Sequence, residues 1–213
     1  MKIPFVQRSP ANPAPTSESA GPRIAAIHGL LARELMERHL AKFLIASGYP
    51  DTTVYGHVYP ARRIADDLAE AADAGRPIAV VGFSQGGFQA VEVARQLARR
   101  GIEVPLLVTI AAGGMGRLVP TRWGSDPRKV PANVQRCLNV YSEADALGAD
   151  KQSAKNRAWA DNEEQQIENV EFPAAEGISH IDLVRCYPES RVHPAVKARC
   201  LDRLLEHLAT VTA

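Results

Sequence analysis

The chain has 213 residues, of which 46% are hydrophobic and 23% charged. This mixture is typical of one globular domain, and it excludes a disordered chain, a fibre or a repeat array. The 25 lysines and arginines nearly balance the 24 acidic residues, so the net charge of +1 gives no general attraction for nucleic acid or for an anionic membrane. We therefore do not expect nucleic acid as a partner.

The chain has three cysteines, too few and too scattered for a disulfide framework, and no Cys/His pair with metal-ligand spacing. We expect free, buried thiols and no metal site. No segment approaches the roughly 20 apolar residues of a membrane span, and the N-terminus lacks the apolar core of a signal peptide. The expectation is a soluble, cytoplasmic protein, unless a leader has been removed or export uses no leader.

The N-terminal segment is the weakest candidate for ordered structure. Residues 9–22 contain no large apolar side chain, so packing cannot offset the entropy lost on ordering them. We expect residues 1–22 to form a flexible tail and residues 23–213 to form one domain. We find no internal repeat.

From Arg23 onward, short apolar runs alternate with stretches of helical period, which is typical of a parallel sheet covered by helices on both faces. Predicted strands cover residues 24–27, 52–59, 78–83, 106–111, 136–141 and 169–173. Predicted helices cover residues 31–44, 61–74, 85–100, 150–168 and 195–208, with Gly48 and Gly101 as stop signals. The fold class is therefore α/β, with about six mostly parallel strands and no separate lid domain. The long loop 113–133 is a candidate functional loop.

Residues 82–86 read Gly-Phe-Ser-Gln-Gly and stand between the most apolar strand and its helix. This G-x-S-x-G pattern in a strand-turn-helix context is typical of a nucleophile elbow, in which Ser84 occupies a tight, strained turn. Small residues at Gly82 and Gly86 let the strand and the helix approach closely. The Gln85 amide lies at the start of the helix, where an unpaired N–H favours a developing oxyanion.

A nucleophilic serine needs a histidine base and a carboxylate that orients it, in the chain order Ser, Asp or Glu, His. Asp145 follows the predicted strand 136–141, and His180 follows the predicted last strand. The carboxyl ends of parallel strands share one edge, so both should lie near Ser84. The alternatives to Asp145 are Glu143 and Asp150. The alternative to His180 is His193, but Pro194 after it indicates a helix start, so His193 is better explained as a surface or capping residue.

The loop after the first strand contains His28-Gly29-Leu30, and the Leu30 amide is the candidate for the second oxyanion donor. We expect the His28 ring to brace this loop rather than to transfer a proton. His39 lies in a predicted helix and His57 in a predicted strand, so both are expected to be structural or solvated.

These motifs, in this order, resemble the α/β-hydrolase fold, and in particular the small lidless bacterial lipases and esterases. The resemblance runs from about Arg23 to about Leu208 and includes residues 27–29, 82–87, 108–114, 141–145 and 179–183. A Ser-Gln pair at the elbow, as in the Phe-Ser-Gln sequence here, is also seen in cutinases and carboxylesterases. The resemblance implies a Ser84, Asp145 and His180 triad, an oxyanion hole from Leu30 and Gln85, and ester hydrolysis without a metal or organic cofactor.

The predicted function is cleavage of carboxylic esters, from small molecules or lipids, through an acyl-enzyme. An acyl-thioesterase or an acyltransferase with the same triad is the first alternative, and a catalytically silent binding module is the second. Trp123 and Trp159 fall in the two irregular segments near the catalytic edge, where they are candidates for contact with the substrate or for ordinary packing.

Overall fold

The computed structural model describes residues 21–114 and 126–211. Within these residues, six strands form one sheet in the order β2-β1-β3-β4-β5-β6, and every neighbouring pair is parallel. The strands are β1 (Arg23–His28), β2 (Thr52–Gly56), β3 (Ile78–Phe83), β4 (Val104–Ile110), β5 (Val134–Ser142) and β6 (Gln166–Phe172). The predicted α/β architecture is confirmed. Most of the predicted tail, residues 1–20, and Trp123 lie outside the described residues.

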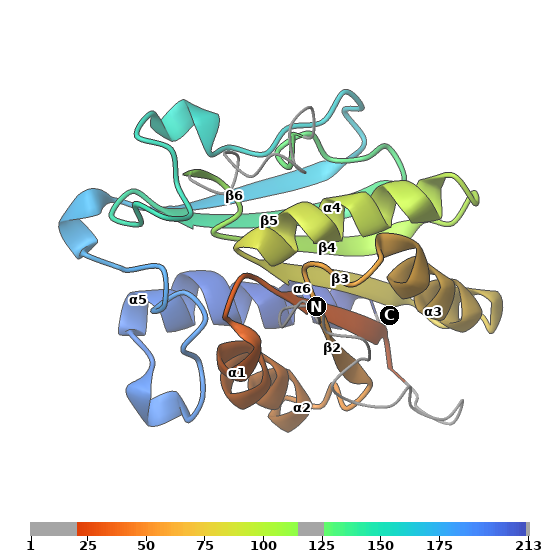
Figure 1. The fold of residues 1–213 in the computed structure, drawn as a ribbon, viewed down its shortest axis with the longest axis horizontal. Helices are drawn as coiled ribbons and strands as arrows, with labels where there is room; N and C mark the ends of the chain where they lie inside the picture. The colour runs from red at the N-terminus through yellow and green to blue at the C-terminus, as the bar shows by residue number, and fades with distance from the viewer. Residues whose placement is uncertain (1–20, 115–125, 212–213) are drawn as a thin grey trace, which may run out of the picture.

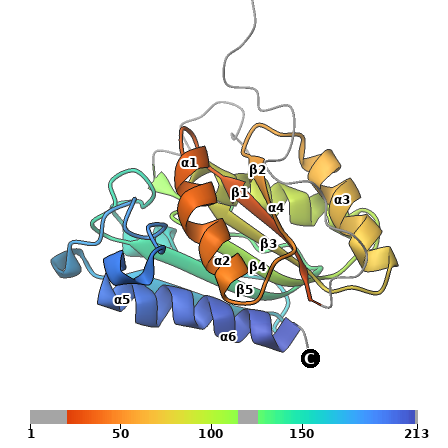
Figure 2. The ribbon, with the colours of Figure 1, turned by 90° about the horizontal axis from the view of Figure 1, so that it is seen from below.

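Helices cover both faces of this sheet (Figures 1 and 2). One face carries α1 (Arg33–Leu35), the π-helical η1 (Met36–Ala41), α2 (Lys42–Ala46), α5 (Pro194–Val196), the π-helical η7 (Lys197–Leu201) and α6 (Asp202–Val211). The other face carries α3 (Ala61–Asp73) and α4 (Gln85–Ala98). Short 3-10 turns occur at η4 (Ser153–Lys155), η5 (Ala174–Glu176) and η6 (Glu189–Arg191). No described helix is long and apolar enough to span a bilayer.

The central strands are apolar on both faces because helices bury both. All six residues of β3 are buried, and alternate side chains enter two separate cores. Val81 and Phe83 pack toward α2 and α6, whereas Val80 packs toward α3 and α4. A continuous apolar run therefore reads correctly as a strand buried on both faces.

Several predicted boundaries are confirmed closely, and one strand is shorter than predicted. β3 spans the predicted residues, and Gly48 and Gly101 take positive φ values of 95° and 72° just beyond their helices, as stop signals should. β2 ends at Gly56 instead of residue 59, because its partner in the sheet, β1, ends opposite at His28. The chain then turns, so that His57 lies after the strand rather than in it.

The predicted helix 150–168 is wrong. Only the single turn η4 forms there, and β6 already begins at Gln166. Asparagine side chains bond to nearby backbone groups in this segment and so compete with helical hydrogen bonds. Asn156 Oδ1, for example, accepts from the Asp150 N–H at 2.7 Å, and Asn162 Oδ1 accepts from the Glu164 N–H at 3.0 Å.

A ladder of polar side chains anchors this segment to the sheet. Asn139 accepts from the Thr109 hydroxyl at 2.9 Å and donates to the Asn156 carbonyl and to Asn169 Oδ1, both at 2.8 Å. Asn169 Oδ1 also accepts from the Ala158 N–H at 2.6 Å. Hydrogen bonds to these amides therefore hold the segment against β5 and β6, where a helix would have packed through an apolar face.

We expect Asn139→Ala to lower the free energy of unfolding by roughly 2–3 kcal/mol, because it leaves several buried partners unsatisfied. The exposed Gln135→Ala in the same strand is the control and should cost less than about 0.5 kcal/mol. Urea denaturation measures both. Equal losses in the two variants would mean that the ladder contributes nothing beyond an ordinary surface contact.

Strand β6 forms one edge of the sheet and carries charged side chains. Glu168 accepts from Arg203 at 2.6 Å and pairs with His207 at 2.8 Å, both on α6. The Arg203 hydrogen bond is the main reason why the pKa of Glu168 lies below its usual range, and it outweighs the opposing effect of burial. These ion pairs therefore link the edge strand to α6, in addition to the apolar core that Phe172 shares with α6.

The strand order brings two loops together. After β1 the chain adds β2 on one side of β1, and it then returns to place β3 on the other side. The loops after β1 and β3 thus flank a topological switch point at the carboxyl edge of the sheet, where ligands of open parallel sheets bind. These are the loops that contain Leu30 and Ser84.

Candidate active site

Ser84 is the one residue between β3 and α4. Its φ of 56° and ψ of −125° are a strained combination for a residue with a side chain. The turn is held from both sides, because the Ser84 N–H donates to the Ile110 carbonyl at 2.8 Å and the Ser84 carbonyl accepts from the Gly87 N–H at 2.9 Å. The neighbouring strand and the helix thus fix the strained residue at the sheet edge.

Gly82 and Gly86 allow this turn to form. A Cβ on Gly82 would overlap the carbonyl of Gly86, and a Cβ on Gly86 would overlap the carbonyl of Ile27. Both overlaps are with backbone atoms, which have little freedom to move. The sheet and the start of α4 therefore approach each other more closely than any side chain would permit.

Gly29, the residue after β1, lies directly against the serine. A Cβ at this position would come within 2.7 Å of Ser84 Cβ and 3.0 Å of Ser84 Oγ. The loop that begins at Gly29 therefore borders the serine hydroxyl, with Leu30 as its next residue. The sequence indicated Gly29 only as part of a His-Gly turn, and its contact with Ser84 follows from the strand order.

Asp145 and His180 are brought together. His180 Nδ1 lies 2.6 Å from Asp145 Oδ2. The Asp145 side chain is only 1% exposed, and its other oxygen accepts from the Leu147 and Gly148 N–H groups at 3.0 and 2.8 Å. A buried carboxylate that is fully hydrogen-bonded in this way holds an imidazole in one orientation.

The loop that carries His180 is positioned by groups that the sequence analysis missed. Ser142 at the end of β5 donates through Oγ to the Ile178 carbonyl at 2.7 Å, which ties the two loops together. The His180 ring packs on the ring of Phe83, with 4.7 Å between centroids. Phe83 precedes Ser84 in the chain, so the same residue supports the elbow and the imidazole.

The alternatives to this pair lie elsewhere. Glu143 accepts from the Ala174 N–H at 3.1 Å, and Asp150 Oδ2 lies 3.4 Å from the Gly114 nitrogen. His193 is the N-cap of α5, with its ring accepting from the Ala195 N–H at 3.3 Å and Pro194 at the first helical position. The prediction that His193 caps a helix is confirmed.

The other three predicted histidines have structural contacts. His28 is buried, and its Nδ1 lies 2.7 Å from the Gly29 carbonyl, so the ring braces the loop beside Ser84. Burial is the largest cause of its lowered pKa, which keeps the ring neutral. The His57 ring packs edge-on against His28 at 6.2 Å, and His39 Nδ1 lies 2.5 Å from the Tyr187 carbonyl.

Gln85 is the first residue of α4, and its amide lies in the first turn of the helix, where N–H groups lack partners within the helix. Leu30 follows Gly29 on the other side of the switch point. The two predicted oxyanion donors therefore belong to the two segments that border Ser84. Their role in catalysis stays a prediction.

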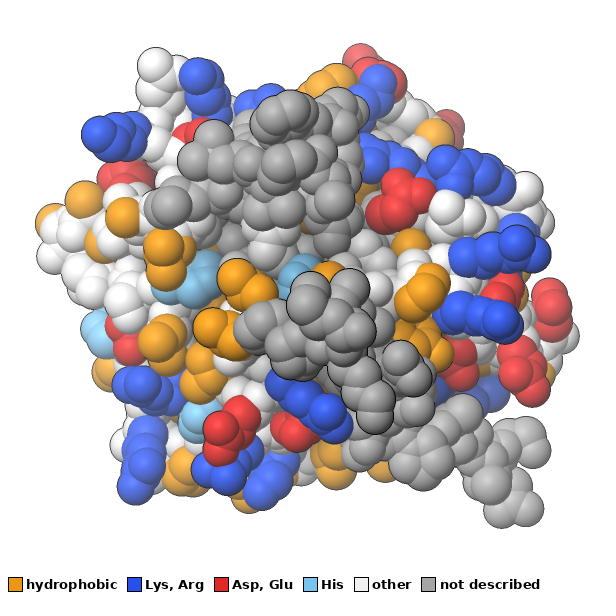
Figure 3. Space-filling view, viewed as in Figure 1, with side chains coloured by type: hydrophobic (Ala, Val, Ile, Leu, Met, Phe, Trp, Pro, Cys, Tyr) orange, Lys and Arg blue, Asp and Glu red, His pale blue; other side chains and the backbone are white. Residues whose placement is uncertain are grey.

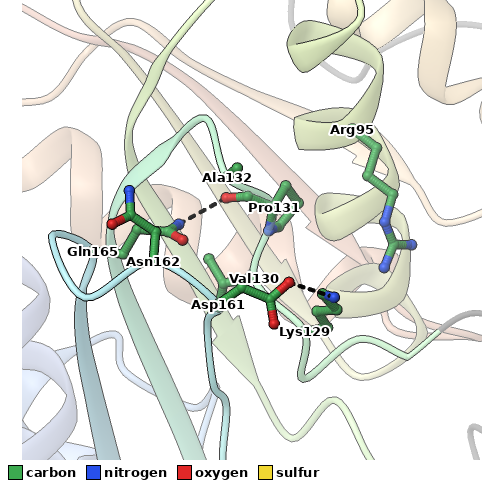
Figure 4. Close-up of a pocket in the computed structure, with 8 residues that line it drawn as sticks. All are labelled: Arg95, Lys129, Val130, Pro131, Ala132, Asp161, Asn162 and Gln165. Atoms are coloured by element: carbon green, nitrogen blue, oxygen red, sulfur yellow. Dashed lines mark hydrogen bonds and ion pairs between the residues drawn. The ribbon is translucent and has the colours of Figure 1, made fainter.

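The structure does not bring Trp159 to the serine. Its backbone pairs with Lys129, and the Lys129 ammonium lies 5.0 Å above its ring. A cavity of about 300 Å³ lies beside these residues, where Lys129 and Asp161 form a 2.6 Å ion pair (Figure 4). The cavity is lined by Arg95, Lys129, Val130, Pro131, Ala132, Asp161, Asn162 and Gln165. These residues precede β5 and β6 or come from the later part of α4, so they lie away from the carboxyl edge.

The three cysteines are free and buried, as predicted. Burial raises the pKa of both Cys137 and Cys200 to about 12. The pKa of Cys186 is also raised, chiefly by burial. Thiols of this kind carry almost no thiolate at neutral pH and are poor nucleophiles.

Comparison with known proteins supports the fold. Residues 61–161 match the family model described as Thioesterase domain. Among solved structures, Est1E from Butyrivibrio proteoclasticus is similar with a TM-score of 0.51 and 18% identity, over 90% of each chain. Human thioesterase 2 has a TM-score of 0.56 and 11% identity, over 89% of this chain and 97% of its own. Aspergillus fumigatus lipase B has a TM-score of 0.57 and 14% identity, over 94% of this chain and 64% of its own. No curated protein matches the sequence significantly.

The chain has the α/β-hydrolase fold. The solved neighbours establish the fold, at identities too low to transfer a substrate. The matched family model begins at α3 and includes both the elbow and Asp145. Together, the matched domain and the fold indicate a hydrolase of the esterase or thioesterase type.

Proposed function

We propose that this protein is a serine hydrolase that cleaves carboxylic esters through an acyl-enzyme. Ser84 is the nucleophile, His180 is the general base and Asp145 orients the imidazole. The observation that carries the proposal is the 2.6 Å contact between His180 and the buried Asp145, on loops that flank the strained Ser84. Ser84, Asp145 and His180 all follow strands that end at the same edge of the sheet, and this supports the proposal.

The chemistry follows from these positions. His180 Nε2 takes the proton of the Ser84 hydroxyl as Oγ attacks the ester carbonyl, and Asp145 stabilises the imidazolium that forms. The Leu30 and Gln85 amides stabilise the oxyanion. The alcohol leaves with the proton from His180, and water, activated by the same base, then releases the acid and restores the serine. Every step uses groups of the chain and water alone.

The first alternative is cleavage of a thioester by the same residues, and the Thioesterase domain match to residues 61–161 favours it. The two substrates share an acyl group and differ in the leaving group. Assays with a matched pair, the p-nitrophenyl ester and the N-acetylcysteamine thioester of one acid, separate them through the ratio of their kcat/KM values. A larger kcat/KM for the thioester would mean that the proposed substrate is a thioester instead of an ester.

We expect His180→Gln to lower kcat by roughly 10⁴-fold or more on either substrate, because it removes the base. Asp145→Asn should have an effect of similar order, because an amide favours the wrong imidazole tautomer. His193→Gln is the matched control and should keep full activity, since His193 caps α5. Equal activity of His180→Gln and His193→Gln would refute the proposed base. A folded wild type without turnover on any ester or thioester would favour the silent binding module.

A further inference from the structure

The turn that begins at Gly29, beside Ser84, contains a leucine that is both strained and exposed, and neither feature stabilises the fold. The Gly29 carbonyl accepts from the Ala32 N–H at 3.3 Å and closes a four-residue turn. Its third residue, Leu31, has a φ of 55°, a position that usually takes glycine or asparagine. Leu31 is also 78% exposed, and Leu30 before it is 60% exposed. A leucine here is thus strained and solvated, and neither condition favours folding.

Other exposed apolar side chains follow the catalytic candidates closely along the chain. Ile181, the residue after His180, is 40% exposed, and Leu147, two residues after Asp145, is 55% exposed. The space-filling view shows apolar side chains gathered beside histidine side chains on the face of Figure 3. Residues next to a triad lie where a substrate enters, so an apolar rim there selects an apolar group.

Two charged side chains beside these apolar residues are engaged by groups of their own segments. Arg33, just after the turn, holds Glu37 at 2.6 Å on its own helix. Asp182, just after Ile181, accepts from the Ser179 hydroxyl at 2.5 Å and from the Ser179 N–H at 2.9 Å. An anionic or strongly polar substrate group would find little to replace its water at this rim.

We propose that Leu30, Leu31 and Ile181 bind the apolar acyl chain of the substrate, and that Leu31 is the residue that sets chain-length preference. This inference rests on the proposed function and specifies its substrate class: a single molecule with an aliphatic acyl chain of medium or greater length. Contact with the chain removes apolar surface from water on both partners, and this explains a leucine in a conformation that glycine adopts more easily.

The test compares Leu31→Asn and Leu31→Met with the wild type on p-nitrophenyl esters from acetate to dodecanoate, below their solubility limits. Asparagine tolerates the positive φ but offers no apolar contact, whereas methionine keeps that contact. We expect Leu31→Asn to lower kcat/KM about tenfold for the long esters and to leave acetate nearly unchanged. Leu31→Met should restore most of the loss. The Tm of Leu31→Asn should equal or exceed that of the wild type.

Ile45→Asn is the matched control. Ile45 is 42% exposed on α2, which ends before the amino end of β2, on the opposite edge of the sheet from Ser84. Its chain-length profile should match the wild type. A loss in Leu31→Asn that is equal for all esters, or no loss at all, would overturn the inference. The long esters are assayed above their solubility limits as well, and a loss seen only there would also overturn the inference, because the leucines would then bind a lipid surface.

A binding measurement separates this inference from the proposed function. Fluorescence titration with cis-parinaric acid, an apolar long-chain acid, requires no turnover. We expect wild-type protein and Ile45→Asn to bind the probe alike and Leu31→Asn to bind it about tenfold more weakly. That result supports the acyl contact even if no ester is cleaved. Equal binding by all three proteins would refute the contact even if ester hydrolysis is established.

Discussion

Ser84→Ala is expected to reduce ester hydrolysis by on the order of 10⁶-fold while the fold and the Tm stay close to those of the wild type. The change removes one oxygen atom from a half-buried side chain, and alanine retains the backbone conformation of the elbow. Residual hydrolysis would come from the oxyanion donors and from substrate binding alone. Steady-state assays at matched protein concentration, with circular dichroism for the fold, measure both effects.

The covalent intermediate gives this prediction a second measurement. A fluorophosphonate should add one adduct to wild-type protein, and peptide mass spectrometry should locate it on Ser84. Ser190→Ala is the control, because Ser190 is exposed on the turn η6. We expect that variant to label and to hydrolyse like the wild type. Labelling at another residue, or turnover by Ser84→Ala near the wild-type rate, would remove Ser84 from the mechanism.

Gly86→Ala is expected to have the largest effect on stability, a loss of about 3 kcal/mol or more in the free energy of unfolding. The added Cβ would overlap the Ile27 carbonyl oxygen and carbon and would lie 3.0 Å from the carbonyl carbon of His28. These atoms belong to β1, in the interior of the sheet. Alanine in a helix is otherwise favoured over glycine by about 1 kcal/mol, so the measured loss of stability is smaller than the energetic cost of the overlap.

Guanidinium denaturation of Gly86→Ala and of Gly21→Ala provides the comparison. A Cβ on Gly21 would have no other atom within 4 Å, so that substitution should cost little. Because α4 must move away from β1 to admit the new methyl group, the Gln85 amide should also move, and Gly86→Ala should lose activity even where it remains folded. A variant as stable as the wild type would contradict the close approach of α4 to β1.

The parts of the fold that were predictable are those where local chemistry and tertiary packing agree. β3 is apolar on both faces and is followed by a serine between glycines. This pattern predicts a buried strand that ends at an elbow, and the strand is observed at Ile78–Phe83. Pro194 likewise indicates the helix at α5. In such segments, tertiary contacts reinforce what the residues favour alone.

The helix predicted at residues 150–168 was wrong because local composition and tertiary contacts disagree there. Residues 150–168 are polar with few turn signals, and this composition suits an exposed helix. The chain instead fastens that segment to β5 and β6 through Asn139 and Asn169, which stand 30 residues apart in the sequence and side by side in the sheet. A pairing between distant amides has no local pattern, so it becomes visible only once the strand register is known.

The candidate site divides in the same way. The pairing of Asp145 with His180 follows from strand order, because both residues come after predicted strands that end at one edge. The contact of Gly29 with Ser84, the support of His180 by Phe83 and the bond from Ser142 to Ile178 depend on side-chain and loop positions. The pairing of Asp145 with His180 was therefore predictable from residue types and strand order, whereas the groups that position the pair were not.

The charged edge strand has a consequence for association between copies of the chain. An open strand edge offers unpaired N–H and carbonyl groups to any other strand, and this is a common route to aggregation. On β6, Glu168 and Glu171 stand in a seven-residue strand that offers only three large apolar side chains. A second copy that docked edge to edge would bring carboxylates of the two strands close together. These charges therefore disfavour edge-to-edge association between copies of the chain.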